Sequence, residues 1–427
     1  MNIESNDAGI PTGLQRLVGG KTGLLEKIVL QVPDRTEPAP FQTAPEMTSL
    51  KHLLETDDRL SLNITGKGAD FQSSVESCIG ELAERYSMSW PDRDRMTRGS
   101  YAELSQSEHV VDFEYLDLVE ESVRDEHLIE LTRDTEMLWE PGTDLLTGRR
   151  VHVPAEHVWN RIRFLGEEPM YFLGTSNGVA AGPTIEAAML WALYELIERD
   201  GIMRTWWQHK QPPSVEIDEL PWLTEFTQRH LPSDDLSVQI FESQSKIDIP
   251  TYLSALVNER DAYPNFLVAG GADLDMESAL ADAAIESCQG WIYTHHLRNI
   301  YDADSVSMDD LHITLEKNLL YYADPRNFED VSFLFDGPPL QLSPEQYPDV
   351  DGWSIRQRLD HLLELLEQAD CTPIAFDLTA EDIGNSGINV ARVVVPELVS
   401  LTPSGIPPAK HPAFEGKEIN TQPHPFP

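Results

Sequence analysis

Lysine is scarce in this sequence. Only nine of its 427 residues are lysines, and 31 basic residues face 73 acidic ones, so the net charge is −42. A charge of this sign excludes non-specific affinity for nucleic acid or for anionic lipid as the main function. An acid-rich, lysine-poor surface suits a cytosol of very high salt, in which charge repulsion is screened, and we expect a halophilic protein.

Cysteine is also scarce. Cys78, Cys288 and Cys371 show neither CxxC spacing nor an even-numbered framework, which predicts a reduced protein rather than a disulfide scaffold. The chain starts without a basic segment followed by an apolar one, so we expect no signal peptide. Its longest apolar stretch, AAMLWALYELI, is too short to span a bilayer. We therefore expect a cytoplasmic protein with no membrane partner.

Two glycine-containing stretches match phosphate-binding motifs only in part. GGKTG, over residues 19–23, would need a glycine at position 15 to complete a P-loop, and Gln15 stands there. GKGADF, over residues 66–71, lacks the third glycine of a dinucleotide fingerprint. The sequence therefore offers neither motif, and a nucleotide site would have to be built in another way.

Three segments of the chain resemble one another, and each begins with a glycine. GADFQSSVESCIGELAERY starts at Gly68, GPTIEAAMLWALYELIERD at Gly182, and the looser GADLDMESALADAAIESCQGW at Gly271. In the first two, a glutamate opens an E-x-x-E-R pattern; in the third, glutamine takes the place of the second glutamate. The polar positions are Glu81, Glu84 and Arg85; Glu195, Glu198 and Arg199; and Glu286 and Gln289. A small residue stands seven positions before each leading glutamate, namely Ser74, Ala188 and Ala279.

Each segment is predicted to be a helix entered from a glycine turn. On the first, Ser77, Glu81, Glu84 and Arg85 fall on one face. The second is apolar almost all round over residues 187–197, which is typical of a buried helix. A carboxylate on such a helix must be hydrogen-bonded, paired or bound to a cation, because a bare buried charge is very costly.

A single E-x-x-E-R pattern is most often an exposed set of charges at a helix end. Three phased copies favour a shared cation site instead, at which carboxylates from three interior helices meet. Mg²⁺ prefers a few carboxylates together with nucleotide phosphates, and arginines hold phosphate oxygens in bidentate fashion. The residues therefore predict a site for Mg²⁺ and a nucleotide without a P-loop.

The first two segments resemble the signature segments of the YcaO family, the YcaO-type cyclodehydratases. The resemblance runs from about Thr65 to the C-terminus. The family's S-x3-E-x2-E-R pattern is met from Ser77 to Arg85, and its A-x6-E-x2-Q element from Ala279 to Gln289. The stretch IAFDLTAEDIGNSGINVARVVVPELVSL resembles the family's late strand region, with Asp377, Thr379, Arg392 and Pro396 at the matching positions.

This resemblance implies an ATP site in which glutamates hold Mg²⁺, and activation of a backbone amide oxygen by phosphorylation. Arg298 fits the family's R-x3-E element, although Asp302 is one methylene shorter than the glutamate of that pattern. Ser77 and Gln289 are candidates for neutral polar contacts to the nucleotide. The candidate Mg²⁺ ligands are Glu81, Glu84, Glu195, Glu198 and Glu286, and the candidate phosphate contacts are Arg85, Arg199 and Arg298.

Several reactions in this family share that activation. Azoline-forming members convert Cys, Ser or Thr of a ribosomal precursor peptide to thiazoline or oxazoline; others make thioamides or amidines, and a non-catalytic nucleotide-binding scaffold is a third alternative. Azoline-forming members often end in P-x-P-x-P, as this chain does at Pro423, Pro425 and Pro427. A polyproline-II tail without a role is the plain alternative. The ending favours a cyclodehydratase, with the terminal carboxylate of Pro427, or His424, as the candidate base.

The tail gives a direct expectation: deleting residues 423–427 should abolish cyclisation and leave the fold and much of the ATP binding intact. The chain resembles the stand-alone type of the family, which works with a separate E1-like (ThiF-like) protein that presents the leader of the precursor peptide. We expect a homodimer, and a flavin dehydrogenase that oxidises the azolines is a further candidate partner.

The fold is expected to be α+β, with mostly antiparallel sheets and the three repeat helices around one nucleotide site. Residues 1–60 are predicted to be a lead-in segment and residues 61–427 the YcaO domain, with an insertion or partner-contacting lobe over residues 90–165. A polar helix is expected over residues 354–370. The candidate strands are residues 109–118, 251–257, 266–271, 373–379 and 388–396.

Overall fold

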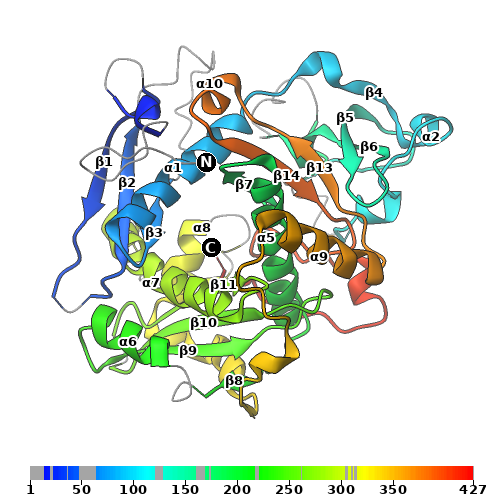
Figure 1. Ribbon diagram of the computed structural model, residues 1–427. Coiled ribbons are helices and arrows are strands. Elements are labelled where there is room, and N and C mark those ends of the chain that lie inside the picture. The colour runs from blue at the N-terminus through cyan, green and yellow to red at the C-terminus, as the bar shows by residue number, and fades with distance from the viewer. Residues whose placement is uncertain are drawn as a thin grey trace.

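The structure is a computed structural model, and Figure 1 shows how its elements are arranged. It describes residues 14–19, 23–35, 37–47, 64–120, 128–159, 169–172, 175–216, 221–260, 262–302, 306–308, 311 and 315–426. Helices and mostly antiparallel strands are mixed along the chain, which confirms the expected α+β class. None of the described helices combines the length and apolarity that a membrane crossing needs.

The largest sheet has six strands and is antiparallel throughout. β5 and β13 pair at its middle, so residues from the 90–165 region lie in the same sheet as the late strand region. Contact of that region with a partner stays a prediction. The strand order is β4 (Thr97–Ser100), β5 (Glu136–Asp144), β13 (Ile374–Asp377), β14 (Asn389–Val394) and β7 (Val179–Gly182), and β6 (Arg150–Pro154) pairs with β5.

Two further sheets complete the fold. The five-stranded sheet is antiparallel except for its last pair, β8 with β12, which is parallel. Its order is β11 (Phe266–Ala272), β10 (Thr251–Asn258), β9 (Leu236–Glu242), β8 (Ser214–Val215) and β12 (Pro339–Leu340). The three-stranded sheet consists of β1 (Leu25–Gln31), β2 (Phe41–Met47) and β3 (Gly66–Gly68). The described strands of the lead-in segment therefore pair with the strand that precedes the first repeat helix.

The three repeat segments form the three long helices α1 (Phe71–Ser87), α5 (Ile185–Trp207) and α7 (Met276–Ile300), as predicted. Each follows a strand directly: β3 precedes α1, β7 precedes α5, and β11 precedes α7. α5 packs on both larger sheets, against β7 and β14 on one side and β10 and β11 on the other. The three helices surround the middle of the molecule in Figure 1.

The glycines before these helices allow strand and helix to approach closely. A Cβ at Gly66 would lie 1.9 Å from the Ser74 carbonyl oxygen, and one at Gly271 would lie 2.2 Å from that of Ala279. A Cβ at Gly182 would lie 2.8 Å from the backbone nitrogen of Ala188 on the second helix. The small residue seven positions before each leading glutamate is therefore the point at which the helix backbone touches its own strand. The side chains of Asp70, Thr184 and Asp275 cap the three helix starts.

The remaining helices lie around this centre. α9 (Ile355–Gln368) packs against α5 and matches the polar helix expected over residues 354–370. The others are α2 (Tyr101–Leu104), α4 (Ala155–Val158), α6 (Pro221–His230), α8 (Leu315–Tyr322) and α10 (Glu381–Gly384). Short 3₁₀ turns include Phe113–Tyr115, Pro325–Asp330, Ser332–Phe335 and Pro412–Phe414.

One predicted strand is wrong. Over residues 109–118 the structure has an isolated bridge between Val110 and His152, followed by the 3₁₀ turn. Asp112 causes the break, because its side chain accepts a hydrogen bond from the Glu114 backbone N–H and caps the turn. The strands expected over residues 251–257, 266–271, 373–379 and 388–396 are present as β10, β11, β13 and β14.

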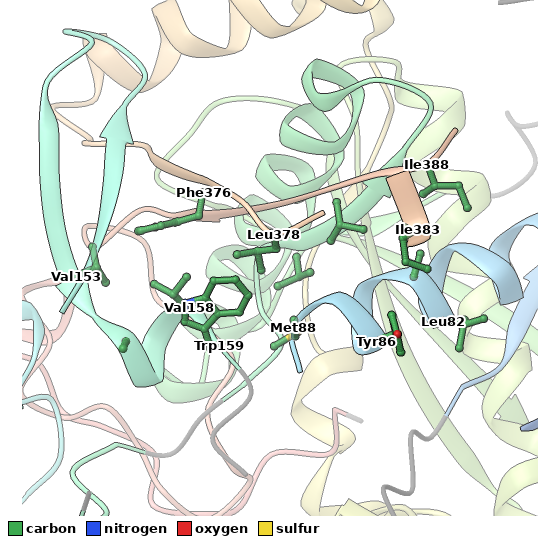
Figure 2. Packing of buried hydrophobic residues seen from close by; sticks show 14 of the residues in the cluster. Leu82, Tyr86, Met88, Val153, Val158, Trp159, Phe376, Leu378, Ile383 and Ile388 are labelled. Carbon is green, nitrogen blue, oxygen red and sulfur yellow. The ribbon is translucent and has the colours of Figure 1, made fainter. Parts of the chain in front are cut away.

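Apolar side chains fix the first repeat helix to the six-stranded sheet. Figure 2 shows Leu82, Tyr86 and Met88 near the end of α1, in one cluster with Phe376 on β13 and Val158 on α4. This packing holds one face of α1, so the opposite face can carry polar groups toward the centre of the molecule.

Candidate functional site

A cavity of about 970 Å³ lies among α1, α5 and α7, and we call it the carboxylate cavity. Nine of the ten residues predicted to contact the nucleotide line it, although they come from three distant parts of the chain. They are Ser77, Glu81, Glu84, Arg85, Glu195, Glu198, Arg199, Glu286 and Gln289. Arg298 is not among the lining residues: it is exposed near the end of α7 and lies over the Tyr263 ring, 4.4 Å from its centroid.

The three helices present equivalent positions to the carboxylate cavity. Glu81, Glu195 and Glu286 each stand ten residues after the first residue of their helix. One turn further along, Glu84, Glu198 and Gln289 form the second set of equivalent positions. Because the strand–glycine–helix geometry is the same in all three units, these side chains converge on one space.

Backbone N–H groups hold several of the carboxylates in place. Glu81 accepts a hydrogen bond from the Thr65 N–H, and Glu195 accepts one from the Gly178 N–H, both at 2.9 Å. Glu84 accepts one from the N–H of Ala181 on β7, also at 2.9 Å. The second oxygen of each carboxylate is thereby free of the backbone and can turn toward a ligand.

The basic side chain that pairs with the leading glutamate differs among the three repeat helices. On α1 and α5 an arginine four residues after the leading glutamate pairs with it, at 3.5 Å for Arg85–Glu81 and 3.8 Å for Arg199–Glu195. α7 has Gly290 at the corresponding position. Its Glu286 is paired instead with Lys67, which reaches across from β3.

Lys67 was not predicted from the sequence. GKGADF lacks the third glycine of a dinucleotide fingerprint, yet a lysine between two glycines in so lysine-poor a chain is a usable signal. Asp282 on α7, one turn before Glu286, also lines the carboxylate cavity and was missed. Thr65 was missed as well; its hydroxyl accepts a hydrogen bond from the Gln289 amide at 2.6 Å.

Four of the five glutamates that are candidate Mg²⁺ ligands have raised pKa values, and Glu286 is the exception. Burial, reinforced by the neighbouring Glu195 and Glu81, raises the pKa of Glu84 to about 8. Burial also raises the pKa of Glu198 to about 7, against the opposing effect of Arg199. Burial opposes ionisation of Glu286 too, but Lys67 and Arg199 lower the pKa of this carboxyl overall. A bound cation would stabilise the ionised forms of Glu84 and Glu198 and would therefore lower both pKa values.

The donor set fits Mg²⁺ held together with phosphates. In the described part of the chain no three His, Cys, Asp or Glu side chains stand close enough to hold a metal ion by themselves. Mg²⁺ is ordinarily held by one or two carboxylates and completed by phosphate oxygens and water. Carboxylates spread over three helices, with arginines and a lysine between them, match that requirement better than they match a site made of protein ligands alone.

The C-terminal segment packs into the core beside the carboxylate cavity. Pro427 lies outside the described residues, but Phe426 before it is 1% exposed. Tyr322 on α8 donates a hydrogen bond to the Pro423 carbonyl oxygen, and Asn318 donates one to that of His424. Pro425 is buried within this anchored segment.

This packing corrects the expectation that residues 423–427 can be deleted without cost to the fold. Phe426 belongs to a hydrophobic cluster with Trp206 of α5, so its loss would open the core. His424 donates a hydrogen bond from Nε2 to the Thr402 carbonyl oxygen at 2.7 Å, and burial lowers its pKa to about 4. The geometry makes His424 an anchor of the tail.

The family of the chain follows from its match to a family model. Residues 65–399 match the model described as YcaO cyclodehydratase, ATP- and Mg²⁺-binding. The chain belongs to the YcaO family. The two ligands predicted from the carboxylates and arginines, ATP and Mg²⁺, are those of YcaO proteins. Comparison with curated protein sequences gives no match.

Solved structures share the YcaO fold. A heterocyclase in complex with substrate and cofactor has 21% identity and a TM-score of 0.74, with 100% of this chain and 59% of that chain covered. YcaO from Methanopyrus kandleri bound with AMPPCP and Mg²⁺ has 21% identity and a TM-score of 0.61, covering 88% and 86%. The E. coli microcin synthetase McbBCD complex with bound pro-MccB17 has 13% identity and a TM-score of 0.58, covering 94% and 96%. This YcaO chain therefore spans about three fifths of the first heterocyclase.

Proposed function

We propose that this protein is an ATP-dependent peptide cyclodehydratase that converts Cys, Ser or Thr of a ribosomal precursor to thiazoline or oxazoline. The observation that carries the proposal is the convergence of the three repeat helices on one cavity, with the proline-rich C-terminal segment anchored beside it. YcaO membership and the heterocyclase fold of its structural neighbours support an enzyme that uses ATP in this way.

The proposed reaction needs charge neutralisation more than covalent catalysis. The substrate thiol or hydroxyl attacks the preceding carbonyl carbon, and the resulting oxyanion takes the γ-phosphoryl group of ATP. The C–O bond then breaks, phosphate leaves with the amide oxygen, and the amide proton is lost as the ring closes. Mg²⁺, when bound, neutralises charge on the transferring phosphoryl group.

The chain's own residues have separate tasks in this proposal. Arg85, Arg199 and Lys67 bind phosphate oxygens, and Glu81, Glu84, Glu195, Glu198 and Glu286 hold Mg²⁺. Arg298 is exposed and lies apart from the lining of the carboxylate cavity, so its contact with phosphate stays a prediction. The terminal carboxylate of Pro427 is the candidate base that accepts the proton of the nucleophile. The stiffness of the proline-rich tail would hold that carboxylate at small entropic cost.

The proposed reaction also requires a protein that brings the precursor peptide to the enzyme. We propose that a separate E1-like protein presents the leader of the precursor peptide. The microcin synthetase whose fold it shares is itself a complex with a pro-peptide bound, which is a property of that protein.

The test combines the purified chain with Mg-ATP, a Cys/Ser/Thr-rich precursor and an E1-like protein, and follows the intact mass of the precursor. We expect each modified residue to lose the mass of one water, with consumption of ATP. Glu198→Gln should abolish both changes, whereas a scaffold would tolerate it. Replacement of oxygen by sulfur in the product would contradict azoline formation and indicate a thioamide synthase.

A further inference from the structure

A second cavity, of about 140 Å³, lies beside the carboxylate cavity, and we call it the apolar cavity. Its walls include the buried side chains of Val153, Leu398 and Ile406. Asn177 and Leu401 line both cavities, and the Asn177 amide donates a hydrogen bond to the Leu401 carbonyl oxygen at 2.7 Å. The two cavities are therefore separated by a shared wall that this hydrogen bond holds together.

The C-terminal segment is anchored at the same wall. Thr402 directly follows Leu401, and its carbonyl oxygen accepts a hydrogen bond from Nε2 of His424 at 2.7 Å. The His424 backbone N–H donates to the Ser404 carbonyl oxygen at 3.0 Å. The carboxylate cavity, the apolar cavity and the tail thus meet around residues 401–404. A peptide bond that reacts between the phosphates and the tail would lie at this meeting point.

Three buried polar atoms of residues that line the apolar cavity lack a hydrogen-bond partner among the described residues: Nε of Arg392, Nε2 of His157 and Oγ1 of Thr402. The Arg392 guanidinium is nevertheless fixed, because its terminal nitrogens donate to the carbonyl oxygens of Val158 at 3.3 Å and Thr175 at 3.0 Å. Buried polar groups are ordinarily hydrogen-bonded. A ligand that combines an apolar side chain with a peptide carbonyl would fill the apolar space and give the Arg392 Nε–H the acceptor that it lacks.

We propose that the apolar cavity binds the aliphatic side chain of the precursor residue that directly precedes the cyclised Cys, Ser or Thr. The inference rests on the proposed function, in which the attacked carbonyl belongs to that preceding residue. Its side chain branches one bond away from this carbonyl. A carbonyl held at the shared wall therefore places the side chain in the neighbouring cavity, while the Arg392 Nε–H donates to a backbone carbonyl of the same peptide.

Binding of two short blocked peptides tests this site. They differ only in the residue before a central cysteine, leucine in one and glycine in the other, and calorimetry measures their Kd for the full chain with Mg²⁺ and a non-hydrolysable ATP analogue. We expect the leucine peptide to bind about tenfold more tightly, the factor that burial of one aliphatic side chain supplies. Equal affinity for the two peptides would overturn the proposal.

A variant that fills the apolar cavity with a larger side chain provides a second test. Ile406→Phe should remove the preference for leucine and leave the Kd of the nucleotide analogue unchanged, and the matched control Ile406→Val should keep the preference. A preference that survives in a folded Ile406→Phe variant would also overturn the proposal. Because peptide binding is read without turnover, a preference for leucine together with an unchanged mass of the full precursor in the Mg-ATP assay would contradict the proposed function alone.

Discussion

At the scale of single residues, the raised pKa of Glu84 shows that the carboxylate cavity disfavours additional negative charge. Its pKa is raised to about 8, first by burial and then by the neighbouring Glu195 and Glu81. The folded chain therefore holds this proton more tightly than the unfolded chain, whose glutamates titrate near 4.5. The contribution of Glu84 to stability is accordingly present at low pH and is lost as the pH rises from about 4.5 to about 8.

Nucleotide binding should release protons for the same reason. At pH 7 the Glu84 carboxyl is mostly protonated, and binding of Mg²⁺ with ATP favours its ionised form. Calorimetry in two buffers of different ionisation enthalpy measures the number of protons released for each nucleotide bound. We expect net release in the unmodified chain and a smaller release in Glu84→Gln. Binding without proton release would show that Glu84 is already ionised or lies away from the cation.

Lys67 is the second residue whose role can be isolated. It pairs with Glu286 where the other two helices use their own arginines. Lys67→Met removes the lysine that is paired with the Glu286 carboxylate and one proposed phosphate contact, so we expect the KM for ATP to rise by about tenfold or more. Lys67→Arg keeps the charge and should recover much of the affinity. If Lys67→Met has the same KM as the unmodified chain, Lys67 does not contact the nucleotide.

At the scale of elements, the repeat units were predictable because each carries its information locally. A glycine turn followed by a small residue seven positions before a leading glutamate suffices to specify a strand, a close turn and a helix that points one face inward. The partners that complete the cavity were not predictable in this way. Lys67 comes from the strand of the first unit but pairs with Glu286 of the third, and only the packed fold brings them together.

The same distinction explains the errors. The apolar alternation around residues 109–118 favoured a strand, but Asp112 caps a turn there. Arg298 fits a family pattern by position, yet it lies over Tyr263 and outside the lining of the carboxylate cavity. Burial of the tail was equally hidden, because Phe426 packs against Trp206, more than two hundred residues earlier in the chain.

Two truncations separate the structural part of the tail from its proposed chemical part. Deleting residues 423–427 removes buried Phe426 and should lower the free energy of unfolding by about 3–5 kcal/mol, as measured by urea denaturation. Deleting Pro427 alone should leave stability and ATP affinity unchanged, because the anchoring contacts of Pro423 and His424 remain, but it should abolish cyclisation. A chain without Pro427 that cyclises at the full rate would show that the terminal carboxylate position is not used.

At the scale of the whole molecule, the net charge determines how stability depends on salt. A charge of −42 on 427 residues produces self-repulsion that salt screens. We expect the protein to unfold on dilution from molar salt into about 10 mM salt, where the screening length grows to about 30 Å, and circular dichroism would follow the loss of helix. Bound Mg-ATP should shift the transition to lower salt. Full stability in low salt would contradict the expected adaptation to a saline cytosol.

The central claim is that the carboxylate cavity transfers the γ-phosphoryl group to a peptide amide oxygen. The most direct measurement uses a precursor labelled with ¹⁸O at the carbonyl before the cyclised residue, together with Mg-ATP and the E1-like protein. The account predicts that ¹⁸O leaves the peptide and is found in inorganic phosphate, in step with the loss of one water mass, and that Glu198→Gln abolishes both. Unlabelled phosphate alongside a cyclised peptide would contradict it.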